Sequence, residues 1–426
     1  MKPKRIEPAD RLFGELRLPG DKSISHRAVM TGAIAKGETR VVGLLDCDDC
    51  SYTIRAFRDM GISIEREGDI TAIKGKGLRG LREPGAPIYV GNSGTTMRLL
   101  AGILAGQKFE ATLAGDESLS HRPMRRIVEP LSLMGAGIKA RDGEYPPLTI
   151  KGGALRPVDY KLPIPSAQIK SAILFAGLYA KGTTRVKEVF KSRDHTERIL
   201  KYFGSRLKIQ GLGIALSGGR DLKGKLIEIP GDISGASFFI VGAILLKGSR
   251  LRINKIGINP TRAGILNLLS RMGARIKVLN KKDLFEPVAD LEVEYSRTKG
   301  VVIEGKSIPG IIDELPIIFV LAALSKGKTI IKGISELRVK ETDRINSMEE
   351  NLKNMGARIR LAGDGIVIDG VGALEGAALK SYDDHRTCMA LVIAALAAKG
   401  GSSIDNIECV NKSFPEFFHV LEGLKQ

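Results

Sequence analysis

LPGDKSISHRAVMTGAIAKG, residues 18–37, joins a polar, cationic cluster to an apolar run. The Pro-Gly pair near its beginning prevents a helix from starting earlier, and Ser23 or Ser25 can cap a helix that continues through the apolar run. Gly37 is expected to supply the left-handed residue that ends this helix. The segment therefore predicts a short, buried helix with a polar first turn.

The first turn of this helix is expected to bind an anion. Its free backbone N–H groups and the positive end of its dipole favour a negatively charged ligand. Lys22 and Arg27 add two positive charges beside it. Taken without the rest of the chain, the same residues are equally compatible with a solvated helix start.

The order of apolar run, glycine and β-like segment recurs at intervals of about 70 residues. A second marker, an aliphatic helix end followed by glycine and a strand, alternates with the first. Six copies of one unit therefore account for nearly the whole chain. The first marker falls at Gly37, Gly106, Gly182, Gly248, Gly327 and Gly400, and the second at Gly61, Gly135, Gly204, Gly273 and Gly356.

Each copy reads as strand, helix, strand, helix and hairpin, which predicts an α/β fold of two lobes with three βαβαββ units each. The helices before the first marker are apolar nearly all round, so we expect them to be buried and parallel inside each lobe. The expected lobes are residues 15–228 and residues 1–14 with 229–426, the N-terminal strand completing the second lobe. If the lobes face each other, the six helix starts point into one cleft.

The formal net charge of +18 indicates an anionic partner, either a nucleic acid or a small phosphorylated or carboxylated molecule. Aromatic residues make up only 5% of the chain and tryptophan is absent, so stacking platforms for single-stranded nucleic acid are few. The apolar runs are too short to span a bilayer, and no charged-then-apolar leader opens the sequence. We therefore expect a cytoplasmic protein that binds small anions rather than nucleic acid or membrane. We also expect it to be a monomer.

Cys47 and Cys50 form a C-D-D-C sequence, which is found in some zinc and redox sites. Cys388 and Cys409 stand alone, so the second half of a zinc site is missing. A structural role is the favoured interpretation of all four. A nucleotide-binding P-loop is excluded, because GDKS lacks the required spacing from an earlier glycine.

Seven stretches of the chain form a distinctive set: PGDKSISHR (19–27), GNSGTTMRLL (91–100), RPM (122–124), SAQIKSA (166–172), LRVKETDR (337–344), DDHR (383–386) and NKSFPEFF (411–418). These motifs resemble those of the EPSP synthase family, the 3-phosphoshikimate 1-carboxyvinyltransferases. The resemblance covers essentially the full length, and it implies two lobes with the active site in the cleft between them. It also implies transfer of the enolpyruvyl group of phosphoenolpyruvate to the 5-hydroxyl of 3-phosphoshikimate, in the shikimate pathway to chorismate and aromatic amino acids, with no metal or organic cofactor.

The resemblance also implies the residues that bind each substrate. Those expected to bind 3-phosphoshikimate are Lys22, Ser23, Arg27, Ser166, Ala167, Gln168, Arg193, Asp313 and Lys340. Those expected to bind phosphoenolpyruvate are Lys22, Gly94, Arg122, Gln168, Arg344, Arg386 and Lys412.

The implied reaction adds a hydroxyl to an enol ether carbon and then eliminates phosphate, so it needs a base and an acid whose roles reverse. Asp313 and Glu341 are the predicted carboxylates, and Lys22 is the predicted cationic proton donor; the assignment of each proton is left open. Lys340 and Arg344, four residues apart, are expected to share one helical face. A salt-bridged surface helix is the alternative for that stretch. His385 is expected either to orient Arg386 or to take part directly.

Two rival functions differ in what they require. A UDP-N-acetylglucosamine enolpyruvyl transferase has a cysteine on a mobile loop and a Lys-Asn pair at its first helix start, whereas residues 115–124 contain no cysteine and the pair here is Lys22-Ser23. An RNA-binding protein would show affinity for RNA that falls steeply with salt concentration.

Gly94 predicts sensitivity to glyphosate, a mimic of phosphoenolpyruvate, because a Cβ there would obstruct the ligand.

Overall fold

The computed structural model describes residues 3–426, which divide into two units. The N-terminal unit is Gly20–Ile229, and the C-terminal unit is residues 3–19 with Pro230–Gln426. The boundary expected at residue 15 falls inside strand β2 (Phe13–Arg17). Because β2 pairs with β15 (Arg250–Gly257), residues 15–19 group with the C-terminal unit.

In the N-terminal unit, α1, α3 and α6 are buried along almost their whole length, as their apolar sequences require. The helices α2, α5 and α7 bury only one face. The helices are α1 (Lys22–Ile34), α2 (Asp48–Asp59), α3 (Gly94–Ala105), α4 (Glu117–Ser120), α5 (Arg125–Leu133), α6 (Ala167–Gly177) and α7 (His195–Tyr202). The strands are β3 (Lys36–Val42), β4 (Ser63–Glu67), β5 (Ile70–Lys76), β6 (Ile88–Tyr89), β7 (Glu110–Ala114), β8 (Gly137–Arg141), β9 (Tyr145–Lys151), β10 (Asp159–Lys161), β11 (Thr183–Lys187), β12 (Arg206–Gln210), β13 (Gly213–Ser217) and β14 (Leu226–Glu228).

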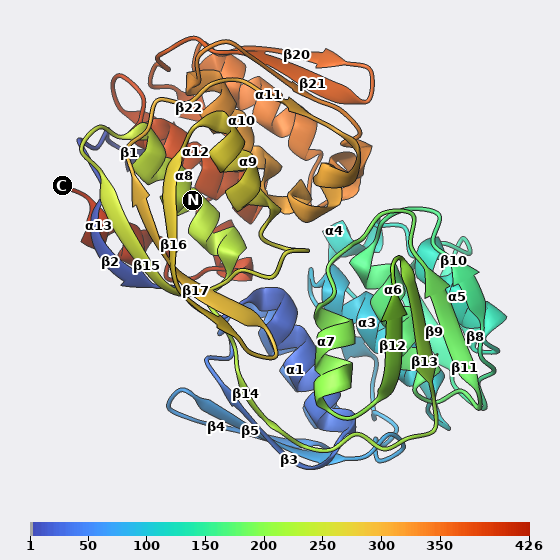
Figure 1. Cartoon of the computed structure of the whole chain (residues 1–426). Helices are drawn as coiled ribbons and strands as arrows, with labels where there is room; N and C mark the ends of the chain where they lie inside the picture. The colour runs from blue at the N-terminus through green and yellow to red at the C-terminus, as the bar shows by residue number, and fades with distance from the viewer. Residues whose placement is uncertain (1–2) are drawn as a thin grey trace. The chain divides into compact units, whose positions relative to one another are not determined.

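In the C-terminal unit, α8, α10 and α12 are the buried helices, and they pack against one another (Figure 1). The helices are α8 (Ile233–Leu245), α9 (Gly264–Met272), α10 (Leu315–Leu324), α11 (Arg344–Asn354), α12 (His385–Leu396) and α13 (Phe417–Leu424), with 3₁₀ turns η1 (Gly305–Gly310), η2 (Ile312–Glu314), η3 (Ser335–Val339) and η4 (Glu408–Lys412). The strands besides β2 and β15 are β1 (Lys4–Ile6), β16 (Arg275–Asp283), β17 (Pro287–Glu294), β18 (Val302–Ile303), β19 (Lys328–Ile331), β20 (Arg358–Ala362), β21 (Gly365–Asp369), β22 (Ala378–Leu379) and β23 (Ser402–Ile404).

Five four-stranded sheets within residues 3–426 share one strand order. In the sheet β6-β7-β9-β8, for example, β6 pairs parallel with β7, and the β8–β9 hairpin adds through β9, antiparallel to β7. The same order appears as β14-β3-β5-β4, β10-β11-β13-β12, β2-β15-β17-β16 and β18-β19-β21-β20. The predicted α/β fold of repeated βαβαββ units is confirmed.

The sixth sheet of the described chain has three strands, β1-β23-β22. β22 and β23 pair in parallel, as in the other repeats, but β1 takes the antiparallel place that a hairpin strand fills elsewhere. Residues near the N-terminus thus supply a strand to the last repeat.

Asp21 caps α1 rather than Ser23 or Ser25, so this expectation was wrong. The Asp21 carboxylate accepts a hydrogen bond from the backbone N–H of Ile24 at 2.9 Å. The Ser25 hydroxyl instead accepts from the backbone N–H of Leu45 at 3.1 Å. The helix therefore begins at Lys22, directly after the Pro-Gly-Asp sequence.

Gly37 has a left-handed φ of +88°, but it does not end α1. The helix ends at Ile34, and Gly37 lies in β3. The glycines of the second marker behave as the pattern suggests, because all five have positive φ and follow a helix end.

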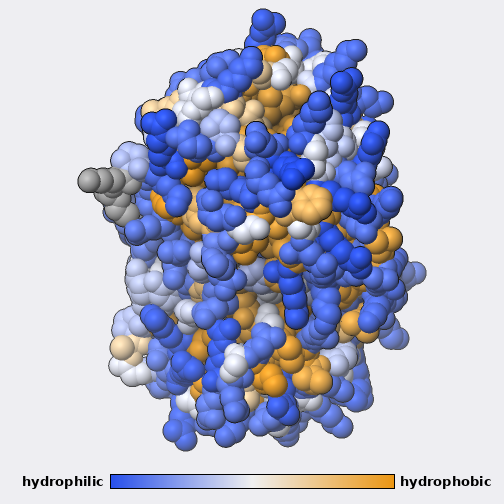
Figure 2. All heavy atoms as spheres, turned by 90° about the vertical axis from the view of Figure 1, so that its left-hand side faces the viewer, coloured by the Kyte–Doolittle hydropathy of each residue, from blue (hydrophilic) through white to orange (hydrophobic). Residues whose placement is uncertain are grey.

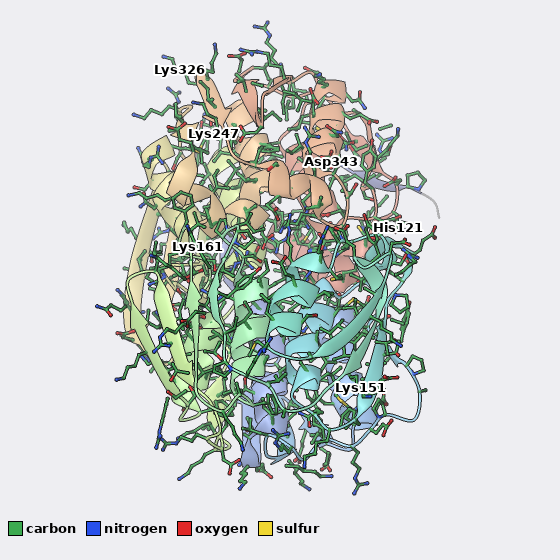
Figure 3. All side chains as sticks on the ribbon, turned by 90° about the vertical axis from the view of Figure 1, so that its right-hand side faces the viewer. His121, Lys151, Lys161, Lys247, Lys326 and Asp343 are labelled. Atoms are coloured by element: carbon green, nitrogen blue, oxygen red, sulfur yellow. The ribbon has the colours of Figure 1, made fainter. Side chains whose placement is uncertain are left out.

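Hydrophilic residues predominate on the face drawn in Figure 2, with hydrophobic residues among them in small groups. The four lysines labelled in Figure 3 are all exposed: Lys151, Lys161, Lys247 and Lys326. Among the helices of residues 3–426, none combines the length and apolar character of a membrane span.

Candidate active site

In the N-terminal unit, the starts of the three buried helices lie together. Arg27 of α1 donates through Nη2 to the Ser171 hydroxyl of α6 at 2.9 Å. Arg98 of α3 donates through Nη1 to Oε1 of Gln168, also on α6, at 2.9 Å. Side chains from three repeats therefore meet at one end of this helix set.

The guanidinium of Arg27 is buried and held in one orientation. It donates to the backbone oxygen of Ser23 at 2.8 Å and to the Thr196 hydroxyl at 2.6 Å, in addition to Ser171. The ammonium of Lys22 lies 2.9 Å from a carboxylate oxygen of Asp49, and both side chains are largely buried. Two of the predicted cations are thus preorganised at the start of α1.

Gly94, the first residue of α3, leaves room for two guanidinium groups. A Cβ built there would lie 2.7 Å from Nη1 of Arg98 and 3.4 Å from Nη1 of Arg122. Arg122 donates through Nη2 to Oδ1 of Asn92 at 2.5 Å, and the Asn92 amide donates in turn to the Asp116 carboxylate at 2.9 and 3.0 Å. A side chain at Gly94 would therefore displace the Arg98 guanidinium from its present position.

The start of α6 carries the predicted Ser166, Ala167 and Gln168. Ser166 caps the helix, accepting from the backbone N–H of Ile169 at 3.4 Å. The Gln168 amide also donates to the Thr95 hydroxyl of α3 at 3.1 Å.

The predicted Arg193 lies partly buried in the loop before α7, and a buried ion cluster fixes this loop. Lys170 of α6 is fully buried, with its Nζ 2.7 Å from Glu197 and 3.1 Å from Glu188. Its Nζ also donates to the backbone oxygen of Ser192 at 3.4 Å. Burial raises the pKa of Glu197, and the charge of Lys170 opposes that shift.

His26 is buried among α1, α2 and α3 residues. Its Nδ1 hydrogen-bonds to the Thr53 hydroxyl at 2.7 Å, and Thr53 hydrogen-bonds to Thr96 at 2.7 Å. Burial, with the charges of Lys22 and Arg27, holds the pKa of His26 well below its ordinary value. His26 is therefore a neutral imidazole that links α1 to α2 and, through Thr53, to α3.

In the C-terminal unit, the starts of α8, α10 and α12 also lie together. The Ser234 hydroxyl of α8 donates to Oε1 of the buried Glu314, which directly precedes α10, at 2.5 Å. Arg386 of α12 donates to the Ser234 hydroxyl and, at 2.9 Å, to the backbone oxygen of Asp313. Arg262 donates to the same Glu314 oxygen at 2.7 Å.

One buried guanidinium, that of Arg344, contacts both predicted catalytic carboxylates. Its Nη1 lies 3.5 Å from Asp313 and its Nη2 lies 2.5 Å from Glu341, while Nε lies 2.8 Å from Asp384. Burial lowers the pKa of Arg344, but the three carboxylates together shift it above its ordinary value. Arg344 therefore stays charged between the two carboxylates.

Two further cations lie near Asp313. Nζ of Lys340 is 3.9 Å from one of its carboxylate oxygens, and Nη2 of Arg386 is 3.8 Å from the other. Lys412, at the end of η4, donates to the backbone oxygen of Asp383 at 2.7 Å. His385 is buried as the first residue of α12.

Lys340 and Arg344 do not share a helical face, so this expectation was wrong. The 3₁₀ turn η3 ends at Val339, and α11 begins only at Arg344. Asp343, labelled in Figure 3, caps α11 by accepting from two backbone N–H groups at 3.0 and 3.1 Å. The two cations instead approach Asp313 from separate local structures.

Sequence reasoning missed several buried partners of the predicted residues. Asp49 holds Lys22, Thr196 holds Arg27, Asp384 holds Arg344 and Glu314 lies beside Arg386. Asp384 stands in the DDHR motif and Glu314 follows Asp313, so adjacency to a predicted residue was an available signal for both.

The four cysteines are free thiols and all are buried. Within residues 3–426, His, Cys, Asp and Glu side chains form no group of three or more that could hold a metal ion.

Comparisons with known proteins agree along the whole chain. The EPSP synthase (3-phosphoshikimate 1-carboxyvinyltransferase) family model matches residues 6–421. A 3-phosphoshikimate 1-carboxyvinyltransferase from Brevibacillus brevis is 49% identical over 424 residues, covering 99% of this chain and 100% of the relative. An EPSP synthase structure from Acinetobacter baumannii has a TM-score of 0.88 at 44% identity, covering 99% of this chain and 98% of that one. The enolpyruvyl transferase NikO from Streptomyces tendae, at 19% identity, has a TM-score of 0.81 and covers 99% of this chain and 96% of its own, which indicates a shared fold. This chain belongs to the EPSP synthase (3-phosphoshikimate 1-carboxyvinyltransferase) family.

Proposed function

We propose that this chain transfers the enolpyruvyl group of phosphoenolpyruvate to the 5-hydroxyl of 3-phosphoshikimate, releasing phosphate. Family membership supports this reaction. The observation that carries it is the contact of Arg344 with both Asp313 and Glu341, with Lys340 and Arg386 beside Asp313. Carboxylates suited to proton transfer thus lie among cations suited to anionic substrates.

The residues proposed to bind 3-phosphoshikimate combine hydroxyls, helix-start amides and cations. This is the donor set that phosphate oxygens require. Arg27 supports the assignment most directly, because two hydroxyls and a backbone oxygen fix its guanidinium. The proposed set is Lys22, Ser23, Arg27, Ser166, Ala167, Gln168, Arg193, Asp313 and Lys340.

The residues proposed to bind phosphoenolpyruvate supply charge for its phosphate and carboxylate groups. Gly94 supports the assignment because it has no Cβ that would approach the guanidinium groups of Arg98 and Arg122. Arg386 supports it because hydrogen bonds to Ser234 and to the backbone oxygen of Asp313 fix its guanidinium. The proposed set is Lys22, Gly94, Arg122, Gln168, Arg344, Arg386 and Lys412. The proposed set draws residues from both units.

The proposed chemistry is an addition followed by an elimination. The 5-hydroxyl oxygen bonds to C2 of phosphoenolpyruvate while its proton passes to a base and another proton reaches C3. In the second step, C3 loses a proton and the C2–O bond to phosphate breaks, which restores the double bond. Asp313 and Glu341 are proposed to carry these protons, with Lys22 as a cationic donor near the bridging oxygen.

Proton transfer and fixed charge suffice for both steps, so we propose no metal or organic cofactor. The low aromatic content supports the absence of a nucleic-acid partner. We further propose a monomer, and membership in a biosynthetic enzyme family supports a cytoplasmic location.

Phosphate release tests the proposed function. The purified chain is expected to release phosphate from phosphoenolpyruvate only when 3-phosphoshikimate is present. UDP-N-acetylglucosamine, supplied as an alternative or competing acceptor, is expected neither to support nor to inhibit release. Phosphate release from phosphoenolpyruvate with UDP-N-acetylglucosamine as the sole acceptor would contradict the assignment of 3-phosphoshikimate as the acceptor.

A further inference from the structure

We propose that Tyr382 is a positioning residue for the three cations Arg344, Arg386 and Lys412. The inference rests on the proposed function, which assigns these cations to phosphoenolpyruvate. Tyr382 lies outside the set implied by the family resemblance.

Tyr382 and Asp383 form a left-handed turn directly before α12. Their φ values are +54° and +52°, in a region that residues with a Cβ rarely adopt. Two such residues in succession persist only where the surrounding structure holds them. The turn therefore has a local cost that its contacts must offset.

The turn sets the geometry of all three cations. It presents the backbone oxygen of Asp383 to Nζ of Lys412 at 2.7 Å. It also leads directly into Asp384, whose Oδ2 accepts from Nε of Arg344 and whose Oδ1 accepts from the backbone N–H of Arg386, each at 2.8 Å. A change in this turn would move the partners of the three cations together.

The phenol of Tyr382 anchors the turn to α11, the helix that begins with Arg344. Its hydroxyl donates to Oε2 of Glu350, and Lys380 donates to Oε1 of the same carboxylate at 3.0 Å. Hydrogen bonds from Tyr382 and Lys380 lower the pKa of Glu350, so it stays an acceptor at neutral pH. Burial, together with the hydrogen bond to Glu350 and the charge of that carboxylate, raises the pKa of Tyr382 to about 12, so the phenol stays a donor.

Asn280 offers a matched comparison elsewhere in the C-terminal unit. It also has a left-handed φ, +51°, and its side chain also donates to a carboxylate, that of Asp290 at 2.7 Å. It lies in the β16–β17 hairpin and contacts none of the three cations in the interactions described above.

The test compares Tyr382→Phe and Glu350→Gln with the wild type in the phosphate-release assay. Each variant loses the hydrogen bond that anchors the turn to α11, and this bond lies outside the substrate contacts. Because the turn then holds the partners of the three cations less firmly, KM for phosphoenolpyruvate is expected to rise about threefold to tenfold. KM for 3-phosphoshikimate is expected to stay within about twofold of the wild-type value. In the double variant, KM for phosphoenolpyruvate is expected to be no higher than in the more affected single variant, because both changes remove the same hydrogen bond. Asn280→Gly is the control and is expected to change neither KM.

An unchanged KM for phosphoenolpyruvate in both variants would overturn the inference. Equal rises in both KM values would also overturn it, because they would indicate a general loss of structure. A wild-type chain that releases no phosphate from the substrate pair would overturn the proposed function, and this inference with it.

Discussion

Nε of Arg344 donates to Oδ2 of Asp384 at 2.8 Å, and both side chains are almost completely buried. The contact joins the start of α11 to the cap of α12, because the other oxygen of Asp384 accepts from the backbone N–H groups of Arg386 and Thr387. One carboxylate therefore fixes two cations proposed to bind the same substrate.

Asp384→Ala is expected to reduce the free energy of unfolding by about 3–5 kcal/mol, because it leaves the Arg344 charge buried without its Nε partner. Urea unfolding of the C-terminal unit measures this loss of stability. Asp369→Ala removes an exposed partner of Lys328, 3.7 Å away, and is expected to cost about 1 kcal/mol or less. Equal losses in the two variants would contradict the importance assigned to burial.

Gly94→Ala is expected to raise KM for phosphoenolpyruvate about tenfold. The new Cβ would lie 2.7 Å from Nη1 of Arg98, so this guanidinium must move and give up its bond to Gln168. Loss of one hydrogen bond to a charged group costs about 1.5 kcal/mol, which corresponds to that factor. Steady-state kinetics with each substrate varied in turn provide the measurement.

Gly153→Ala is a suitable control for this change, because no atom lies within 4 Å of the Cβ that it adds. It is expected to leave KM unaltered. A Gly94→Ala variant with the wild-type KM for phosphoenolpyruvate would contradict the prediction, because it would show that Arg98 and Arg122 can move without weakening substrate binding.

Asp313→Asn and Glu341→Gln are each expected to lower kcat by about 10² to 10⁴, the usual contribution of a group that transfers a proton. Both variants keep a polar side chain of the same size next to Arg344. Because the two groups act in one reaction, the double variant is expected to lose less than the product of the single losses. Glu349→Gln, which removes only the ion pair with the exposed Lys353, serves as the control. A loss under tenfold in either single variant would exclude that residue as a proton carrier.

The repeated βαβαββ units could be predicted because their glycines and apolar runs recur along the chain. The pairing of β1 with β23 could not, because that register joins residues as far apart as Lys4 and Ile404, which are 400 positions apart. The all-round apolar sequences predicted burial of α8, α10 and α12, and the structure shows it. Strand order is decided by tertiary packing, which a single sequence does not reveal.

The candidate site could likewise be predicted only in part from the sequence. Cations such as Lys22 and Arg344 stand in recognisable motifs, but Thr196, which orients Arg27, lies 169 residues from it. The helix expected over Lys340–Arg344 failed for a local reason that the sequence did contain. Asp343 is a strong N-cap residue, and it begins α11 at Arg344 instead of allowing a helix to run through it.

Glu197 is expected to make stability depend on pH. Its folded pKa is raised by burial, so the folded state holds a proton at pH values where the unfolded carboxyl, with a pKa of about 4.3, has released it. The contribution of Glu197 to stability is therefore fully present below about pH 4.3 and is lost as pH rises through the folded pKa. Glu197→Gln keeps a polar group near Lys170 but cannot titrate.

Urea unfolding of the wild type and Glu197→Gln over a pH series checks this expectation. The stability of the wild type relative to the variant should fall as pH rises above about 4.3, because only the wild type must then bury a charge. Glu65→Gln, a change at an exposed carboxylate, should show no such fall. A relative stability that rises with pH would mean that Lys170 outweighs burial and holds the Glu197 pKa low. The cluster that fixes the Arg193 loop would then be stabilised by its ion pair rather than strained by its buried charge.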